Sequence, residues 1–179
     1  MALTRLPAAS ITGTLAKARF PSGSVIQVVS NSFDDHTSFT LNNTFSQVTN
    51  MNTSITPSST SSKILVLVSL YVCPDGSTSP YVGIRLTRGG SVITDSYGKS
   101  SSSRTRITFG AMVARDSSSS GFNVHHNFLD SPSSSSALTY GVQVKGYSNR
   151  VFNVNFSGSS DGNSGQSVRS TMTLMEIAQ

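Results

Sequence analysis

Hydrophobic residues alternate with polar residues along most of the chain, and the clearest alternation lies at residues 63–73. Successive side chains of a β-strand point to opposite faces, so a period of two predicts a strand. One parity of this segment is aliphatic throughout, at Ile64, Val66, Val68, Leu70 and Val72. The other parity carries Leu65, Leu67 and Tyr71. Because both faces are apolar, the pattern predicts a central strand that is buried on both sides, and one side could meet a neighbouring subunit.

Weaker segments of the same kind follow at a spacing of roughly 10–15 residues, without a helical period. They lie at 24–30, 51–57, 80–95, 106–114, 122–130, 138–146, 150–158 and 167–178, with short strands around Phe39, Leu41, Phe45 and Val48. Gly89-Gly90 predicts a hairpin turn, and we expect 150–158 to pair back on 138–146 across residues 146–149. About eight to ten strands without intervening helices predict an all-β, antiparallel β-sandwich.

Residues 1–23 differ from the rest, because neither a helical nor an alternating period holds there. The start of the chain resembles a weak signal peptide, but Arg5 and Pro7 interrupt it, so we interpret it as retained. We expect an extended N-terminal arm at 1–23, which attaches to an assembly, and a sandwich domain at 24–179. The arm residues expected to contact a shell or a neighbouring protomer are Arg5, Leu6, Ile11, Leu15, Lys17, Arg19 and Phe20.

The composition favours a structural protein over other classes. Only 12% of the residues are charged, and neutral polar surfaces suit oligomer interfaces because few charges must be desolvated there. The net charge of +5 comes without a run of Lys and Arg, so we expect no direct nucleic-acid binding. Cys73 is the only cysteine and reads as a buried apolar residue. The longest apolar run, residues 64–68, is too short to predict a transmembrane segment.

Two histidines stand side by side at His125 and His126. On a strand they would point to opposite faces, so they cannot share a metal ion within one chain. Three copies of one histidine around a three-fold axis could bind a cation, but a polar or interfacial role is the simpler interpretation. The sequence therefore predicts no metal site and no cofactor.

Other groups of polar residues are equally weak signals of chemistry. Asp34, Asp35 and His36 are adjacent, but serine is so abundant that a Ser–His–Asp site cannot be inferred from them. Asp75-Gly76 and Asp161-Gly162 are explained by turns, because neither provides the spaced ligands of a calcium loop. We expect no catalytic residue and a protein that is not an enzyme.

Basic residues offer one further hypothesis. Arg104 and Arg106 share a parity, and Arg85 shares its row with Tyr81 and Thr87. These side chains could bind an acidic partner surface, and a solvated sheet face is the alternative.

Several segments together resemble one group of proteins. They are GSVIQVV (23–29), SITPSSTSSKILVLVSL (54–70), IRLTRGG (84–90), SRTRITFGAM (103–112), NFLDSP (127–132), TYGVQVKG (139–146) and TLMEIA (173–178). In this order they resemble small virion structural proteins of tailed phages, including phages of cyanobacteria. The resemblance implies a trimeric jelly roll, similar to the tumour-necrosis-factor and complement head domains, and members that are not enzymes.

The resemblance also implies a role and a place. The expected function is that of a capsid decoration (cement) protein on the virion surface, which forms trimeric knobs and binds the major capsid protein or another virion protein. The alternative is a tail-fibre or spike component that binds a host surface glycan through Tyr81, Tyr97, Tyr147 and the Ser/Asn loops. We expect no membrane partner. The residues expected at the trimer interface are Leu65, Leu67, Tyr71, Phe109, His126, Phe128 and Leu174.

Overall fold

The computed structural model describes residues 20–179 except 42, 75–80, 113–120, 147–149 and 158–164. The described residues form β-strands and one 3-10 turn, η3 (Thr94–Ser96). The longer strands are β1 (Val25–Phe33), β2 (Thr37–Leu41), β3 (Ser46–Ile55), β4 (Lys63–Pro74), β5 (Tyr81–Arg88), β7 (Phe109–Met112), β8 (Phe122–Asp130), β9 (Leu138–Lys145), β10 (Arg150–Val154) and β13 (Ser170–Ile177). The two-residue strands are β6 (Ser91–Val92), β11 (Phe156–Ser157) and β12 (Gln166–Ser167). The prediction of an all-β chain is confirmed for this part of the molecule.

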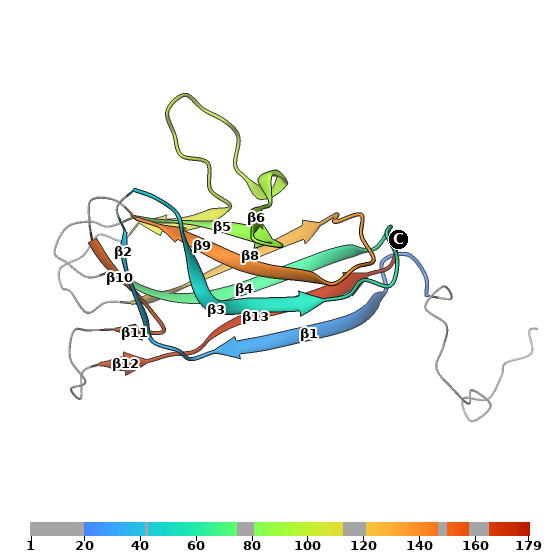
Figure 1. Ribbon diagram of the computed structural model, residues 1–179, viewed down its shortest axis with the longest axis horizontal. Coiled ribbons are helices and arrows are strands. Elements are labelled where there is room, and N and C mark those ends of the chain that lie inside the picture. The colour runs from blue at the N-terminus through green and yellow to red at the C-terminus, as the bar shows by residue number, and fades with distance from the viewer. Residues whose placement is uncertain (1–19, 42, 75–80, 113–120, 147–149, 158–164) are drawn as a thin grey trace, which may run out of the picture.

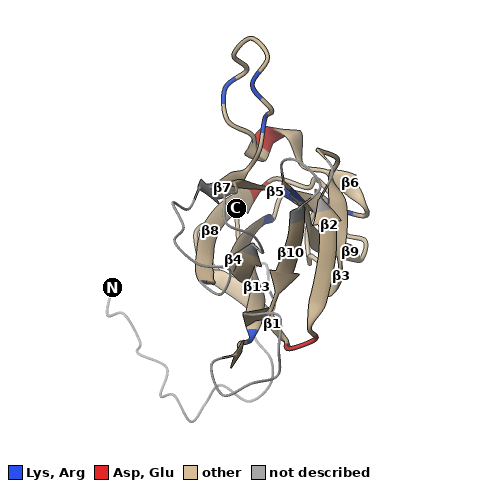
Figure 2. Cartoon of the chain, turned by 90° about the vertical axis from the view of Figure 1, so that its left-hand side faces the viewer, with Lys and Arg blue, Asp and Glu red and all other residues tan. Residues whose placement is uncertain are grey.

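The strands form two antiparallel sheets that lie face to face (Figures 1 and 2). In the first sheet, β4 pairs with β8 along one edge and with β13 and then β10 along the other. β1 pairs with β13, and β2 pairs with β10. The second sheet has the order β3-β9-β5, and β6 and β7 both pair with the free edge of β5. β11 and β12 form a separate pair.

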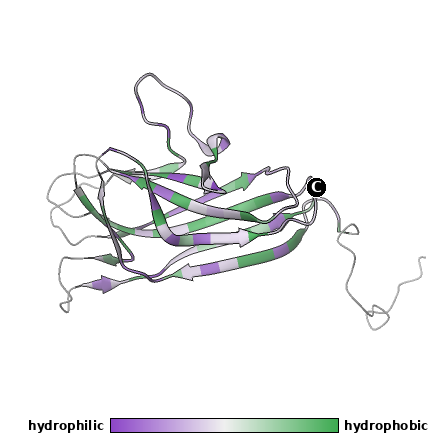
Figure 3. Ribbon diagram, viewed as in Figure 1, coloured by the Kyte–Doolittle hydropathy of each residue, from purple (hydrophilic) through white to green (hydrophobic). Residues whose placement is uncertain are grey.

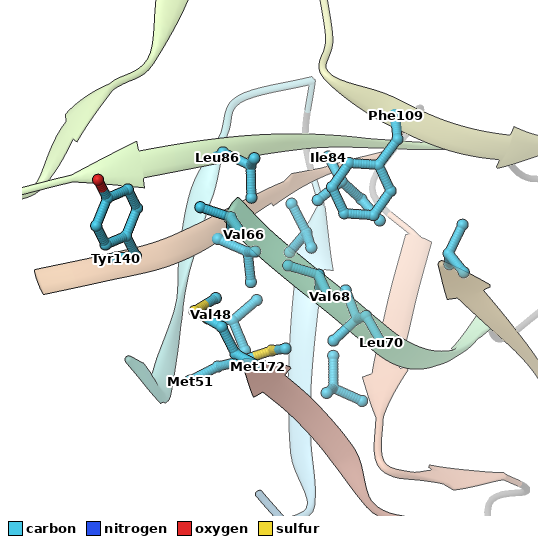
Figure 4. Packing of buried hydrophobic residues seen from close by; sticks show 14 of the residues in the cluster. Val48, Met51, Val66, Val68, Leu70, Ile84, Leu86, Phe109, Tyr140 and Met172 are labelled. Carbon is cyan, nitrogen blue, oxygen red and sulfur yellow. The ribbon is translucent and has the colours of Figure 1, made fainter. Parts of the chain in front are cut away.

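The core lies between the two sheets and follows the alternation of the sequence. The aliphatic parity of β4 is 0–4% exposed and faces the second sheet. Figure 4 shows three of them, Val66, Val68 and Leu70, in the same core as Ile84, Leu86 and Met172. β4 has a partner strand along both edges, so its central position is confirmed. Burial on both faces is not, because Leu65 and Leu67 on the outward side are only half-buried.

Most strand predictions match the structure, and one pairing prediction is wrong. The strand predicted at 122–130 has those bounds. The segment 51–57 is the end of the longer strand β3, which begins at Ser46 and ends at Ile55. In the segment 106–114, β7 begins at Phe109, and residues 113 and 114 lie outside the described residues. The predicted hairpin of β9 with β10 does not form. β9 lies between β3 and β5, and β10 lies between β4 and β2, so each already uses both of its hydrogen-bonding edges within a different sheet.

The predicted Gly-Gly hairpin is confirmed. Gly89 and Gly90 have φ values of +58° and +77° and connect β5 to β6. Two consecutive positive φ values define the tight turn whose twist matches antiparallel strands, and glycine adopts them without steric cost.

The beginning of the described chain lies beside its C-terminal end. The backbone N–H of Gly23 donates to the carbonyl of Ala178, and the N–H of Ala178 donates to Ser24. Of the predicted arm contacts, Phe20 is described and is 36% exposed. Arg5, Leu6, Ile11, Leu15, Lys17 and Arg19 lie outside the described residues.

Candidate functional site

The outward side of the first sheet carries a row of aliphatic side chains across four strands. The strand register places Leu129 of β8 beside Leu65 of β4, then Met175 of β13, then Val28 of β1. Leu129 and Val28 are 45% and 53% exposed. Aliphatic side chains on the solvent side of a sheet gain stability only when another surface covers them.

The next residues along the same strands are small and polar. Ser30 and Thr173 share a hydrogen bond of 2.7 Å between their hydroxyl oxygens, and Leu67 lies beside them on β4. A shallow hollow of about 400 Å³ opens here, lined in part by Leu67, Ser69, His125, Asn127, Thr171 and Thr173. We call the outward-facing residues of β8, β4, β13 and β1 the neutral face. Among the described residues of this face, Lys63 alone carries a formal charge.

The residues that the sequence predicted for a trimer interface do not all lie on the same side of the sandwich. Leu65 and Leu67 lie on the neutral face and are half-buried. Tyr71 has the same parity but is 4% exposed, and its hydroxyl donates to Gln166. The other four point into the sandwich. His126, Phe128 and Leu174 lie beside the inward-facing residues of β4, and Phe109 lies beside the inward-facing Ile84 of β5.

Sequence reasoning missed three members of the aliphatic row, which are Val28, Leu129 and Met175. Their parity was visible in the sequence, but their common position depends on the register between strands that are far apart in the chain. That register is fixed by tertiary pairing, so no local pattern could have found it.

The two adjacent histidines point to opposite faces, as predicted. His125 is exposed on the neutral face, while the ring of His126 stacks on Phe109 with centroids 4.8 Å apart. Burial lowers the pKa of His126, which favours a neutral ring. Among the described residues, no three His, Cys, Asp or Glu side chains are grouped as metal ligands.

The structure brings His36 to a serine that the sequence did not identify. The His36 Nε2 and the Ser167 hydroxyl are 2.8 Å apart, and the imidazole stacks on Phe156. The neighbouring carboxylates are bonded elsewhere, Asp34 to Arg169 and Asp35 to Asn50. In the described part of the chain, no carboxylate therefore orients this imidazole in the way a catalytic triad requires.

The structure describes some of the remaining residues that the sequence suggested for binding, and others lie outside the described residues. Arg85 and Arg106 come together on the outward side of the second sheet, and Arg104 is exposed in the loop beside them. Tyr147 and the turns at Asp75-Gly76 and Asp161-Gly162 lie outside the described residues.

Neither a known protein-family model nor a curated protein matches the sequence. None of the described helical segments is long and apolar enough to span a membrane.

Proposed function

We propose that this protein is a virion structural protein, a capsid decoration protein that assembles as a homotrimer through its neutral face. The observation that carries the proposal is the aliphatic row of Leu129, Leu65, Met175 and Val28, set in a face with almost no charge. Interfaces between permanent partners have this character, because their cores are apolar and depleted in charged residues.

The strand order supports a jelly-roll architecture for each protomer. Without the two-residue strands and without β10 and β2, which extend the first sheet beyond β4, the other eight strands in chain order are β1, β3, β4, β5, β7, β8, β9 and β13. The first sheet then holds the first, eighth, third and sixth of them, and the second sheet holds the second, seventh, fourth and fifth. A jelly roll is a pair of packed sheets of eight strands connected by two Greek keys, and the order of these eight strands supports that architecture for the protomer.

The neutral face supports assembly from copies of the same chain. Each copy carries a net charge of +5, so the copies repel one another, and this repulsion is smallest when the uncharged surfaces meet and the charges lie far apart. Around a three-fold axis, the neutral faces approach one another and the basic second sheets point away from the axis. This arrangement buries Val28 and Leu129, which a single protomer leaves in water.

The role in the particle is mechanical in this proposal. Trimeric knobs bridge shell subunits, and the area buried at each junction opposes the outward pressure of packaged DNA. The arm at 1–23 provides the attachment. Its described end, at Phe20 to Gly23, lies against the C-terminus of the domain, so we infer that the arm leaves the sandwich at that end.

The first experiment measures the mass of the protein in solution. The wild-type chain is expected at three times 18.9 kDa at micromolar concentration. Val28→Glu and Leu129→Glu each bury three carboxylates per trimer and should give folded monomers, because an unpaired buried charge costs several kcal/mol. Ser54→Glu is the matched control, since it adds the same charge to an exposed position of the second sheet and should leave the trimer intact. A wild-type protein that is monomeric throughout this range contradicts the proposal.

The second experiment places the protein in the particle. Labelled antibody should decorate the head, and particles stripped of the protein should rupture at a lower temperature than intact particles. An unchanged rupture temperature would remove the cement role. Label confined to the tail, together with binding of the purified trimer to host cells, would replace it with the tail-fibre function.

A further inference from the structure

The loop between β6 and β7 projects from the outward side of the second sheet (Figures 1 and 2). It spans residues 93–108 and carries Lys99, Arg104 and Arg106, which appear in blue along the projection, against a single acidic residue, Asp95. Figure 3 shows that this loop is mostly polar, in contrast to the strands beneath it.

The base of this loop is fixed to the sheet. The side chain of Ile107 lies over Gly83 and Gly110, where an added Cβ would approach it to 2.8 Å and 3.0 Å. The N–H of Thr108 donates to Ile84, and the N–H of Gly98 donates to Ile107. The two glycines therefore leave room for the Ile107 side chain at the base of the loop. The base is fixed in this way, so the basic side chains of the loop extend from a defined position.

Two arginines are held in place by backbone carbonyls and aromatic rings. Arg85 donates from Nε and Nη2 to the carbonyl of Arg106, at 3.2 Å each, and its guanidinium lies 3.6 Å from the ring centre of Phe45. Arg106 donates from Nε to Gly98. Both guanidinium groups lie near the ring of Tyr97, at 5.1 Å and 5.2 Å. Such contacts restrict the rotamers of the cations before any ligand binds.

A third cation, Lys145, is buried beside them. Lys145 is only 7% exposed, its amine donates to the hydroxyl of Thr105 at 3.1 Å, and it lies 5.5 Å from the ring centre of Phe45. Because Arg85 and Lys145 both lie near this ring, their charges are separated by about one Debye length, ~8–10 Å, or less. Like charges at this distance repel unless an anion lies between or above them.

These three cations have no carboxylate partner among the described residues. The two salt bridges in that part of the chain, Arg88 with Asp130 and Arg169 with Asp34, lie elsewhere. Lysine is rarely buried without a counter-charge, because an unpaired buried cation is costly. Among the described residues, the cluster is therefore a concentration of positive charge that an anionic partner would complement.

We propose that Arg85 and Arg106, held by Phe45 and Tyr97 and supported by the buried charge of Lys145, form a docking site for the carboxylates of an acidic protein surface. We call this group the basic–aromatic cluster. Planar guanidinium groups match carboxylate oxygens, and a positive patch on a projecting loop steers a negative partner toward it.

A partner protein fits these observations better than a saccharide. Stacking of a sugar ring needs an open aromatic face, whereas Phe45 is in contact with Arg85 and Tyr97 has two guanidinium groups near its ring. Arg106 also lies in the loop that projects from the sandwich, together with Lys99 and Arg104, so this part of the positive charge can reach a flat acidic surface.

The test uses the full chain and a peptide of alternating glutamate and glycine residues, at low salt. Nuclear magnetic resonance should show shifts of the Arg85 and Arg106 Nε–H signals and of the Tyr97 ring signals as the peptide is added. Arg106→Gln should weaken binding by about 3- to 10-fold, because one charge-assisted hydrogen-bonding group is lost. Arg169→Gln is the matched control and should bind as the wild type does, since Arg169 is 61% exposed and has its own carboxylate partner.

Salt and competing polyanions complete the test. Binding should weaken between about 50 and 200 mM salt, because the cluster is partly exposed to solvent. Stronger binding of polygalacturonate or single-stranded DNA at the same arginine signals would overturn the assignment to a protein surface. Equal weakening by Arg106→Gln and Arg169→Gln, or no shift with the peptide, would overturn the site itself. None of these results depends on the trimer, which the mass measurement tests separately.

Discussion

The two outer faces of the sandwich arise from the same alternating pattern but differ in almost every physical property. The neutral face is an open sheet surface of serine, threonine and aliphatic side chains, with Lys63 at its margin. The opposite face carries the projecting loop at 93–108 and the cations of the basic–aromatic cluster. The comparison teaches that the two faces differ in charge among the described residues, and both proposals above depend on this difference.

The faces are kept opposite each other by two polar connections inside the sandwich. At one, Asp130 of the first sheet accepts hydrogen bonds from Arg88 and Tyr140 of the second sheet. At the other, Glu176 of β13 accepts bonds from Ser58 and Ser62, in the segment that leads from β3 to β4. A change in either connection should disturb both faces together, whereas a change in the loop should disturb one face only.

The largest effect is expected from Asp130→Ala. Asp130 is 3% exposed, so its removal leaves the Arg88 guanidinium and the Tyr140 hydroxyl without their buried acceptor. Because Arg88 is partly exposed, we expect a loss of about 2–4 kcal/mol of unfolding free energy, measured by urea denaturation. Asp34→Ala is the matched control, since the exposed pair of Asp34 with Arg169 should contribute at most about 1 kcal/mol. Equal losses in the two variants would contradict this account of the connection between the sheets.

A smaller and pH-dependent effect is expected from Glu176→Gln. Glu176 is fully buried and is the only glutamate in the chain. Burial alone would raise its pKa, but hydrogen bonds from Ser58, Gln27 and Ser62 outweigh burial and hold the pKa below the usual value of 4.5. The variant should lose about 1–3 kcal/mol of unfolding free energy at pH 7, because the charge of the carboxylate strengthens these hydrogen bonds.

The sign of the pH dependence follows from the lowered pKa. A carboxyl group that is more acidic in the folded state stabilises the fold above its unfolded pKa, and the contribution is lost as the pH falls through the folded pKa. The difference in unfolding free energy between wild type and Glu176→Gln should therefore be full at pH 7 and shrink below pH 4.5. A difference that stays constant down to pH 3 would show that the charge of Glu176 is not what stabilises this connection.

Much of the fold followed from the local pattern. The parity that buries Ile64 to Val72 also appears in β13, where Met172, Leu174 and Glu176 share the inward side. A one-residue shift would expose a whole set of apolar side chains, so alternation specifies which side of a strand is buried. It does not specify which strand lies beside which, and the expected hairpin of β9 with β10 failed for that reason.

The candidate sites were less predictable, because their members are far apart in the sequence. Arg85 contacts Phe45, and His36 contacts Ser167, only after the two sheets have formed. The alternating pattern placed Leu65 on the outward side of β4. The positions of His126 and Phe128 could not be predicted in this way, because the pattern does not say which side of β8 faces the second sheet.

The smallest effect on stability, and the sharpest separation of the two faces, is expected from Gly83→Ala. The added Cβ would lie 2.8 Å from Cγ2 of Ile107, so that side chain must move and loosen the base of the loop. We expect a loss of about 1 kcal/mol.

Hydrogen exchange can assign that loss to one face. The amides of Gly98 and Thr108 should exchange faster, because their hydrogen bonds hold the loop to the sheet, while the amides of β13 that pair with β4 should not change. The double variant Gly83→Ala with Ile107→Ala should lose less unfolding free energy than the sum of the two single variants. The reason is that Ile107→Ala removes the side-chain atoms that the new Cβ at position 83 would contact too closely. Faster exchange in β13 as well would mean that the neutral face is coupled to the loop, and the two faces could then not act as independent surfaces.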